Sequence, residues 1–252
     1  MVNLKLFLIK IITQLVYLVN LFIVKRTKIK DSKNFIIFGR GESLNKFTQY
    51  HADIKSENII LSNFGLNNIL KTKFKKIIRK YKIILMHNII EERPSFLSIA
   101  GLSVDSVYIA RFKNSLKKND YMSARRRTFK LNGIIGDTFY LPKYIKNFLI
   151  KYKILYENTN TGIFSILLAL SFKPKNIFIF GVDFYDTHFF SHTLLSQLTL
   201  SQYNAMQPNL KNQKETFYKI VKNHKKTKFT IFTKSKLNAK IKKLSNIKIV
   251  KN

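Results

Sequence analysis

The stretch Asn-Ile-Phe-Ile-Phe-Gly-Val-Asp-Phe-Tyr, residues 176–185, decides the fold. Its first half is a short and very apolar run, which is typical of a strand buried on both faces of a parallel sheet. Gly181 ends the run, and Asp183 and Tyr185 follow where the strand would deliver them to its carboxyl end. Ligands of open α/β sheets bind at that edge. Asp183 is therefore a candidate ligand-binding residue, and a structural hydrogen-bond anchor is the alternative.

Further apolar runs on both sides of this stretch alternate with helical patterns, and the alternation predicts an α/β protein with a Rossmann-like, mostly parallel sheet and helices on both faces. Residues 189–208 fit neither pattern, so we interpret about 186–210 as a small lid on a domain that spans 31–252. We expect strands at 35–38, 58–61, 82–86, 107–110, 176–180, 228–232 and 247–250, and helices at 66–81, 142–152, 161–172 and 211–223.

Polar residues follow the first three predicted strands. The first is followed by Gly39-Arg40-Gly41-Glu42-Ser43-Leu44. Its glycines allow a phosphate or ribose to approach the backbone, and Ser43 could cap the next helix or donate a hydrogen bond. A plain tight turn is the alternative. Asn63 and Asn88 follow the second and third strands, where an amide suits a ribose, a base edge or a sugar but is also an ordinary turn residue.

The segment Asn158-Thr159-Asn160-Thr161-Gly162 leads directly into an apolar helix. It places hydroxyl, amide and backbone N–H groups at a positive helix terminus, where an anion is stabilised. Asn160, Thr161 and Gly162 are therefore candidate ligand-binding residues. Simple capping of the helix is the alternative.

Composition excludes several classes of site. The 252 residues contain no cysteine, which excludes disulfides, Cys-ligated zinc, Fe–S clusters and thiol nucleophiles. The net charge is +33, but the lysines are scattered among Asn, Ile and Phe and no nucleic-acid-binding motif is present. We interpret the charge as a sequence-wide bias with attraction to anionic membranes, and nucleic acid as an unlikely partner.

Residues 4–24 form a long apolar stretch with a narrow polar stripe that includes Lys10, Tyr17 and Asn20. The predicted helix, within a segment 1–30, would span a membrane or lie at its interface, whereas an ordinary buried helix is the alternative. Five basic residues follow between 25 and 33. By the positive-inside rule they predict that the main domain lies at the cytoplasmic face of a bacterial inner membrane.

Together these motifs resemble the bacterial sialyltransferases of glycosyltransferase family 42 over about residues 34–237. The glycine loop 39–44, the two asparagines, the T-S-G-like segment 160–162 and the G-I-D-F-Y-like segment 181–185 occur in the family's order. The resemblance implies a glycosyltransferase that transfers sialic acid from CMP-sialic acid to a surface glycan, as in lipooligosaccharide biosynthesis. It also implies inversion, and no metal or other cofactor. The sequence independently contains no D-x-D pair.

The resemblance further implies roles for individual residues. Tyr185 would donate a hydrogen bond to the leaving phosphate, and the glycine loop, the two asparagines, Thr161 and their neighbours would hold the nucleotide. The family's general base, a histidine, falls near Gln207-Pro208-Asn209 here, so His188 or His192 in the lid are the remaining candidates for the base.

Two alternatives stay open: a catalytically altered or inactive homologue of that family, and a basic membrane- or nucleic-acid-binding protein. The sequence does not fix the oligomeric state, and a homo-oligomer is one option.

Overall fold

The computed structural model describes residues 33–39, 41–62, 73–87, 104–110, 112, 137–156, 159–184 and 200–251. Eight strands form one sheet, and every pairing between neighbours is parallel. The strands are β1 Asn34–Phe38, β2 Asn58–Ser62, β3 Lys82–His87, β4 Val104–Ile109, β5 Asp137–Tyr140, β6 Asn176–Phe180, β7 Lys228–Phe232 and β8 Ile247–Val250.

The strand order is β5-β4-β3-β2-β1-β6-β7-β8. From β1 the chain builds outward on one side as far as β5, then returns to place β6 on the other side of β1. The direction of winding therefore reverses between β1 and β6, and such a switch point is where open α/β sheets bind ligands. The predicted Rossmann-like sheet is confirmed, and it is wholly parallel in the described residues.

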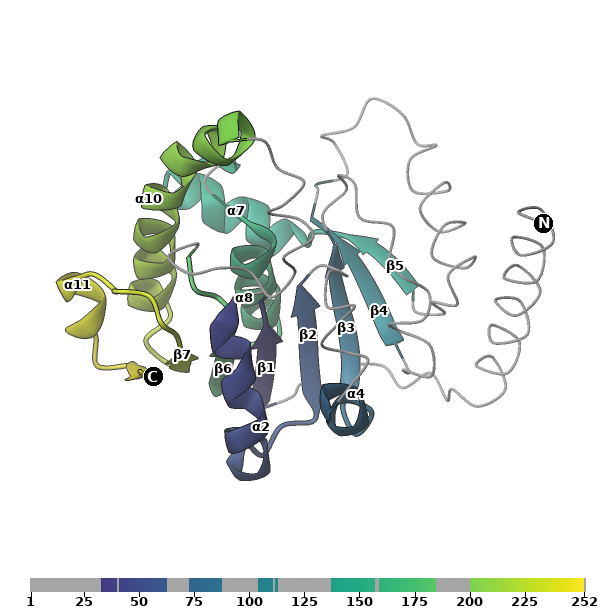
Figure 1. The fold of residues 1–252 in the computed structure, drawn as a ribbon. Coiled ribbons are helices and arrows are strands. Elements are labelled where there is room, and N and C mark those ends of the chain that lie inside the picture. The colour runs from purple at the N-terminus through teal and green to yellow at the C-terminus, as the bar shows by residue number, and fades with distance from the viewer. Residues whose placement is uncertain are drawn as a thin grey trace, which may run out of the picture.

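Helices cover both faces of the sheet, as Figure 1 shows. One face carries the 3₁₀ helix η1 (Glu42–Lys46), α2 (Phe47–Tyr50) and α4 (Lys73–Ile78). A further 3₁₀ turn, η2 (His51–Asp53), follows α2. The opposite face carries α7 (Lys143–Lys151), α8 (Thr161–Ser171), α10 (Leu200–Asn223) and α11 (Ala239–Lys242).

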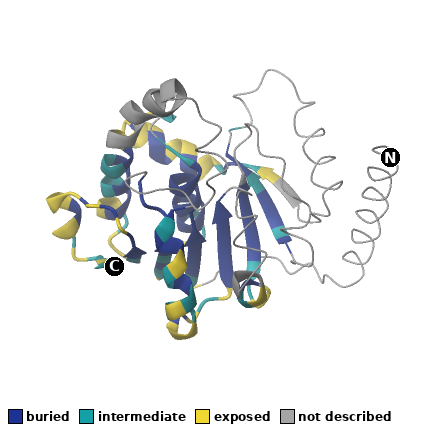
Figure 2. Cartoon of the chain, viewed as in Figure 1, coloured by how far each residue is buried: buried dark blue, intermediate teal, exposed yellow. Residues whose placement is uncertain are grey.

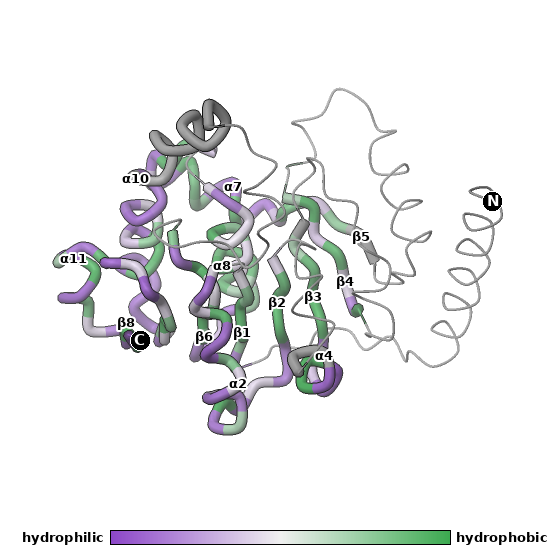
Figure 3. Tube along the Cα trace, viewed as in Figure 1, coloured by the Kyte–Doolittle hydropathy of each residue, from purple (hydrophilic) through white to green (hydrophobic). Residues whose placement is uncertain are grey.

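Alternation along the strands explains the two cores. In β1, Ile36 and Phe38 contribute to the core under η1 and α2, whereas Phe35 and Ile37 contribute to the core under α8. All four are fully buried. The central strands β1, β2 and β3 are accordingly buried in Figure 2 and largely hydrophobic in Figure 3. Helix α8 is buried from Thr161 through Leu170, which explains why its sequence is apolar all round.

Two strands at one end of the sheet, β4 and β5, differ from the prediction. Strand β4 begins at Val104, three residues before the predicted start, because Val104 pairs with Ile83 and the register then shifts. Asp105 lies at this irregularity, and its Oδ2 accepts a hydrogen bond from the Ile83 N–H at 2.8 Å. Strand β5 was not predicted, because its four residues, Asp-Thr-Phe-Tyr, form neither an apolar run nor an alternation of polar and apolar side chains.

Helix α10 also differs from the prediction. It begins at Leu200 rather than at 211, so residues 200–210 of the predicted lid are helical. The buried apolar residues Phe217, Ile220 and Val221 all lie in its second half, and Pro208 counts against a helix in the first half. Of the predicted helix 66–81, residues 73–81 are described, and α4 occupies them only as far as Ile78.

Within the described ranges, no helix combines the length and hydropathy needed to cross a membrane. The predicted N-terminal helix at 4–24 lies outside those ranges, as do residues 186–199 of the predicted lid.

Candidate functional site

The switch point brings two of the predicted motifs into direct contact. The loop after β1 runs beside the end of β6, where the Gly39 N–H donates to the Phe180 carbonyl oxygen and the Gly41 N–H to the Gly181 carbonyl oxygen, both at 2.7 Å. The glycine loop and residues 181–184, which lie about 140 residues apart in the sequence, therefore contact each other at the carboxyl edge of the sheet.

The contacts of these loops explain their glycines. A Cβ on Gly39 would lie 2.1 Å from the Gly181 carbonyl oxygen, and Gly181 has a φ of +70°, which favours glycine. A Cβ on Gly41 would lie 2.3 Å from Oδ2 of Asp183. From the sequence, we expected these glycines to let a ligand approach the backbone. The structure shows that the packing of the protein's own loops already requires them.

Asp183 joins the loops that follow β1, β6 and β7. Its side chain is buried, with 3% exposure. Oδ2 accepts the Ser43 N–H at 2.9 Å, and Oδ1 accepts the Thr233 hydroxyl at 2.8 Å and the Lys234 N–H at 3.2 Å. The Ser235 hydroxyl donates to the Asp183 backbone carbonyl. These bonds give Asp183 the structural role that was the alternative in the sequence, and its contact with a ligand stays a prediction.

Ser43 completes this cluster rather than capping a helix. Its Oγ accepts the Gly181 N–H at 2.9 Å. The N-cap of η1 is Gly41, and no side-chain bond caps that helix. Of the two roles expected for Ser43, helix capping is wrong, and donation of its hydroxyl proton to a ligand stays a prediction.

The N-terminus of α8 is capped by a side chain, which was the alternative to anion binding in the sequence analysis. Asn160 Oδ1 accepts the Ile163 N–H at 2.8 Å, while its Nδ2 donates to Oε1 of Gln213 on α10 at 2.7 Å. Thr161 and Gly162 form the first turn and are buried. The N–H groups of a first turn have no acceptor within the helix, so this terminus retains the positive potential that suits an anion.

Val182 connects the α8 terminus to the glycine loop. Its Cγ2 lies 3.0 Å from the position of a Cβ on Gly39 and 3.4 Å from that of a Cβ on Gly162. One side chain therefore packs against both backbones. The structure brings Gly39, Gly41, Ser43, Asn160, Thr161, Gly162 and Asp183 together at the switch point.

The end of β2 reaches the same helix. Ser62 Oγ lies 2.7 Å from Ser165 Oγ, and Ser165 donates to the Thr161 carbonyl oxygen at 2.9 Å. The chain thus leaves β2 beside the first turn of α8, immediately before Asn63. Asn63, Asn88, Tyr185, His188 and His192 lie outside the described residues, so their roles stay predictions.

The charge of Glu42 has a partner at this edge. The Lys234 Nζ lies 2.6 Å from Glu42 Oε2, with exposures of 43% and 35%. An ion pair this exposed adds little to stability. It does neutralise the carboxylate that would otherwise oppose an anion beside the glycine loop.

Sequence reasoning missed the residues that support this edge, namely Gln213, Thr233, Lys234 and Ser235. Three of them directly follow the predicted strand 228–232, so the rule that selected the other strand ends could have found them. Gln213 lies within a helix, and no local signal marks it. Across the described ranges no three His, Asp or Glu side chains gather as metal ligands would.

The fold and the polar switch point define a Rossmann-like α/β protein with a candidate ligand site at the carboxyl ends of β1 and β6. No protein-family model and no curated protein matches the sequence.

Solved structures do match the fold. One is the sialyltransferase CstII from Campylobacter jejuni in complex with the substrate analogue CMP-3FNeuAc, at 17% identity and a TM-score of 0.55 over 81% of this chain and 83% of that one. Another is the monofunctional α-2,3-sialyltransferase Cst-I from the same organism, at 15% identity and a TM-score of 0.54 over 86% and 84%. A CstII complex with a trisaccharide acceptor and CMP matches at 16% identity and a TM-score of 0.53 over 81% and 83%. The chain therefore has the fold of these sialyltransferases.

Proposed function

We propose that the protein is a glycosyltransferase that transfers sialic acid from CMP-sialic acid to a surface glycan, with inversion and without a metal. The observation that carries the proposal is the fold shared with CMP-bound and acceptor-bound sialyltransferases over about four-fifths of both chains. The polar cluster at the switch point supports it, because that edge is where such sheets bind nucleotides.

In this proposal the nucleotide lies over the β1–β6 switch point. The backbone of the glycine loop, Asn63, Asn88 and Thr161 hold the cytidine nucleotide. The N-terminus of α8 stabilises its phosphate. A CMP donor carries a single phosphate, so one positive helix terminus has less charge to balance than in a diphosphate donor.

The chemical step is assigned to the chain after β6. Tyr185 donates a hydrogen bond to the phosphate as it leaves and gains negative charge. His188 or His192 removes the proton from the acceptor hydroxyl. That oxygen then attacks the anomeric carbon from the face opposite the departing CMP, which inverts the configuration.

Binding of the nucleotide is tested by thermal stability. A ligand at about 100 times its dissociation constant stabilises the folded state by about 2.7 kcal/mol, so CMP and CMP-sialic acid should raise Tm by about 5 to 10 °C. UMP and GMP at the same concentration serve as controls. Equal shifts with all four nucleotides, or none with CMP, would contradict the assignment of the donor.

Turnover is tested separately from binding. We expect one of the two variants, His188→Ala or His192→Ala, to lose activity. Its rate of hydrolysis or transfer of CMP-sialic acid should fall at least about a hundred-fold, which is the low end of the usual contribution of a general base. CMP should still raise Tm in both variants. If neither variant loses activity, both histidines are excluded as the base.

A second candidate is a homologue that binds the nucleotide without transferring sugar. It is favoured by the position of Gln207-Pro208-Asn209, which stands where the family has its histidine and which belongs to α10. This candidate predicts a CMP-dependent rise in Tm with no hydrolysis of any nucleotide sugar in a panel.

We also propose that residues 1–30 hold the protein at the cytoplasmic face of the inner membrane. The apolar stretch 4–24 and the basic cluster after it support this orientation. Replacing Ile11 and Leu15 with aspartate should move the full chain from the membrane fraction to the soluble fraction. An unchanged distribution would contradict the proposal.

A further inference from the structure

The exposed large hydrophobic side chains of the described residues come from one short stretch of the chain. Among the described residues, the large hydrophobic side chains with high exposure are Phe139 (42%), Tyr144 (37%), Ile150 (67%) and Leu155 (65%). All four lie between positions 139 and 155, in β5, α7 and the segment after α7. Single exposed hydrophobics need no explanation, but exposed hydrophobics that share one groove mark a contact surface.

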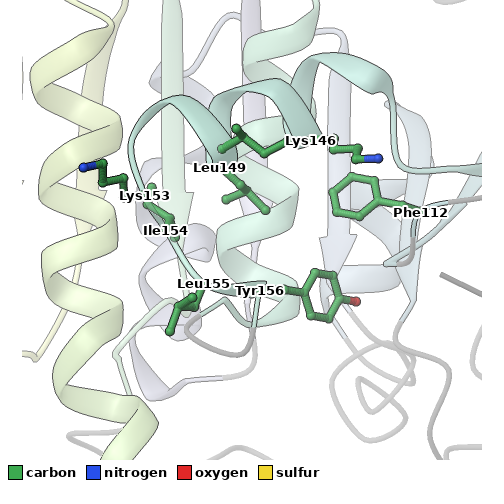
Figure 4. A pocket seen from close by; sticks show the side chains of 8 residues that line it. Phe112, Lys146, Leu149, Lys153, Ile154, Leu155 and Tyr156 are labelled. Atoms are coloured by element: carbon green, nitrogen blue, oxygen red, sulfur yellow. The ribbon is translucent and has the colours of Figure 1, made fainter. Parts of the chain in front are cut away.

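Two of these residues line a groove of about 480 Å³. Ile150 and Leu155 contribute to it together with Leu149, Ile154, Phe112 and Tyr156, so most of its wall is aliphatic or aromatic. Figure 4 shows Leu149 on α7, Ile154, Leu155 and Tyr156 on the segment that follows it, and Phe112 on a separate segment. The groove is large enough to receive apolar groups from outside the protein.

Lysines flank the same groove. Lys146 and Lys153 line it, and Figure 4 shows the side chains of Leu149, Ile154 and Leu155 between them. Residues 138–156 contain four lysines and no Asp or Glu. The surface formed by Lys146, Ile150, Lys153 and Leu155, which we name the α7 face, is thus apolar and cationic at once.

Charge alone does not distinguish this surface from the rest of the protein. Residues 216–252 contain twelve lysines and no Asp or Glu, yet none of the exposed large hydrophobics named above lies there. A nucleic acid would select such lysine surfaces and would gain little from Ile150 or Leu155. An anionic bilayer offers phosphates to the lysines and acyl chains to the aliphatic side chains.

We propose that the α7 face docks on an anionic phospholipid bilayer. This contact belongs to the folded domain and is separate from residues 4–24. It also orients the candidate site, because Tyr156 in the groove donates to the Ala110 carbonyl just beyond β4, and the chain reaches Asn160 four residues later. Docking therefore brings the carboxyl edge of the sheet close to the membrane surface.

The absence of tryptophan from the chain provides a local test. Ile150→Trp places the sole indole in the groove, and its exposure makes the substitution tolerable. With the full chain, we expect its fluorescence to shift to the blue on vesicles that contain phosphatidylglycerol, and not on phosphatidylcholine vesicles or DNA. Lys240→Trp, on the exposed side of α11, is the matched control and should not shift.

The lysines are tested with the same reporter. In the Ile150→Trp background, Lys146→Gln with Lys153→Gln should raise the lipid concentration at half-maximal shift about 30-fold. Each lysine near an anionic surface contributes about 1 kcal/mol, so the loss of two lysines costs about 2 kcal/mol, which is about 30-fold in affinity. Lys240→Gln with Lys243→Gln should change it less than about three-fold.

Several outcomes would overturn the proposal. One is binding of the protein to the vesicles with no shift at position 150, since the contact would then lie elsewhere. Another is emission that is already blue-shifted without vesicles and does not change, since the groove would then be covered by protein. A shift of equal size on phosphatidylcholine, a shift on DNA, or an equal effect of the control lysine pair would also overturn it.

Discussion

At the scale of single residues, Asp183 is the centre of the hydrogen bonds at the candidate site. Two carboxylate oxygens accept three hydrogen bonds, from the Ser43 N–H, the Thr233 hydroxyl and the Lys234 N–H. A buried carboxylate is stable only when it is hydrogen-bonded in this way. Because its donors come from two other strand-end loops, Asp183 fixes the shape of the site even where it does not touch a ligand.

Asp183→Ala should lower the free energy of unfolding by roughly 3 kcal/mol or more, because it leaves three donors at a buried site without their acceptor. Asp183→Asn should cost less, since one amide oxygen can still accept from Thr233 and Lys234. Urea unfolding measures both. Asp53→Asn, at an exposed acid of η2, is the control, and a loss from Asp183→Ala no larger than the control's would refute the role as an anchor.

Two glycines of the site should respond differently to alanine. A Cβ on Gly39 meets the Gly181 carbonyl oxygen at 2.1 Å, so Gly39→Ala should cost roughly 2 kcal/mol or more. A Cβ on Gly162 meets Asn160 Oδ1 at 3.2 Å within a helix that favours alanine, so Gly162→Ala should stay within about 1 kcal/mol of the original. Equal losses of stability in urea would contradict this distinction.

At the scale of elements, α7 and the end of α10 are joined by a histidine. His224 Nδ1 lies 2.6 Å from the Ile220 carbonyl oxygen, so Nδ1 carries the proton, and Nε2 accepts the Tyr144 hydroxyl at 2.6 Å. Phe148 lies against the imidazole, with ring centroids 5.1 Å apart. Burial lowers the pKa of His224 below its ordinary value of 6.5, and the bond to Ile220 raises it only in part.

Stability should therefore fall as the medium becomes acidic. The folded state holds His224 neutral, so its contribution is present above pH 6.5 and is lost as the pH falls through the lowered pKa. Tm measured between pH 8 and 5 should fall less steeply in His224→Gln, whose side chain does not titrate. Lys225→Gln, at an exposed neighbour, is the control and should keep the original slope. The same slope in His224→Gln and the original protein would rule out this contribution.

At the scale of the whole molecule, the net charge of +33 opposes compactness. The hydrophobic cores on both sides of the sheet offset this repulsion, and Figure 2 shows that the central strands β1, β2 and β3 between them are buried. Repulsion should be strongest around residues 216–252, where twelve lysines occur without an acidic residue.

Added salt should consequently stabilise the protein. Raising NaCl from about 0.01 M to about 1 M shortens the Debye length from about 30 Å to about 3 Å, which screens repulsion between exposed lysines. We expect Tm to rise over this range. Replacing Lys240 and Lys243 with glutamate should make the rise smaller, while Lys240→Arg with Lys243→Arg should preserve it. A Tm that is independent of salt would show that self-repulsion is negligible.

Comparison of particular elements shows how far the sequence predicts this fold. The strands at 176–180, 228–232 and 247–250 have the predicted bounds, because dense apolar runs bounded by polar residues identify buried strands locally. For helix α10, the predicted start at 211 is later than the observed start at Leu200, because the first half of the helix has no comparable apolar stripe. Strand β5 was missed because its four residues contain neither an apolar run nor an alternation, so they resemble many loops.

The sequence by itself determined three features of this protein: apolar runs that form buried parallel strands, polar residues that follow those strands, and the absence of cysteine. Only the tertiary structure decided that Gly39 lies against Gly181, that Asp183 accepts from Thr233, and that the exposed apolar side chains meet lysines on the α7 face. The physical reason is that periodicity reports burial along one segment. Strand order, which places residues about 140 positions apart in contact, depends on the packing of all segments together.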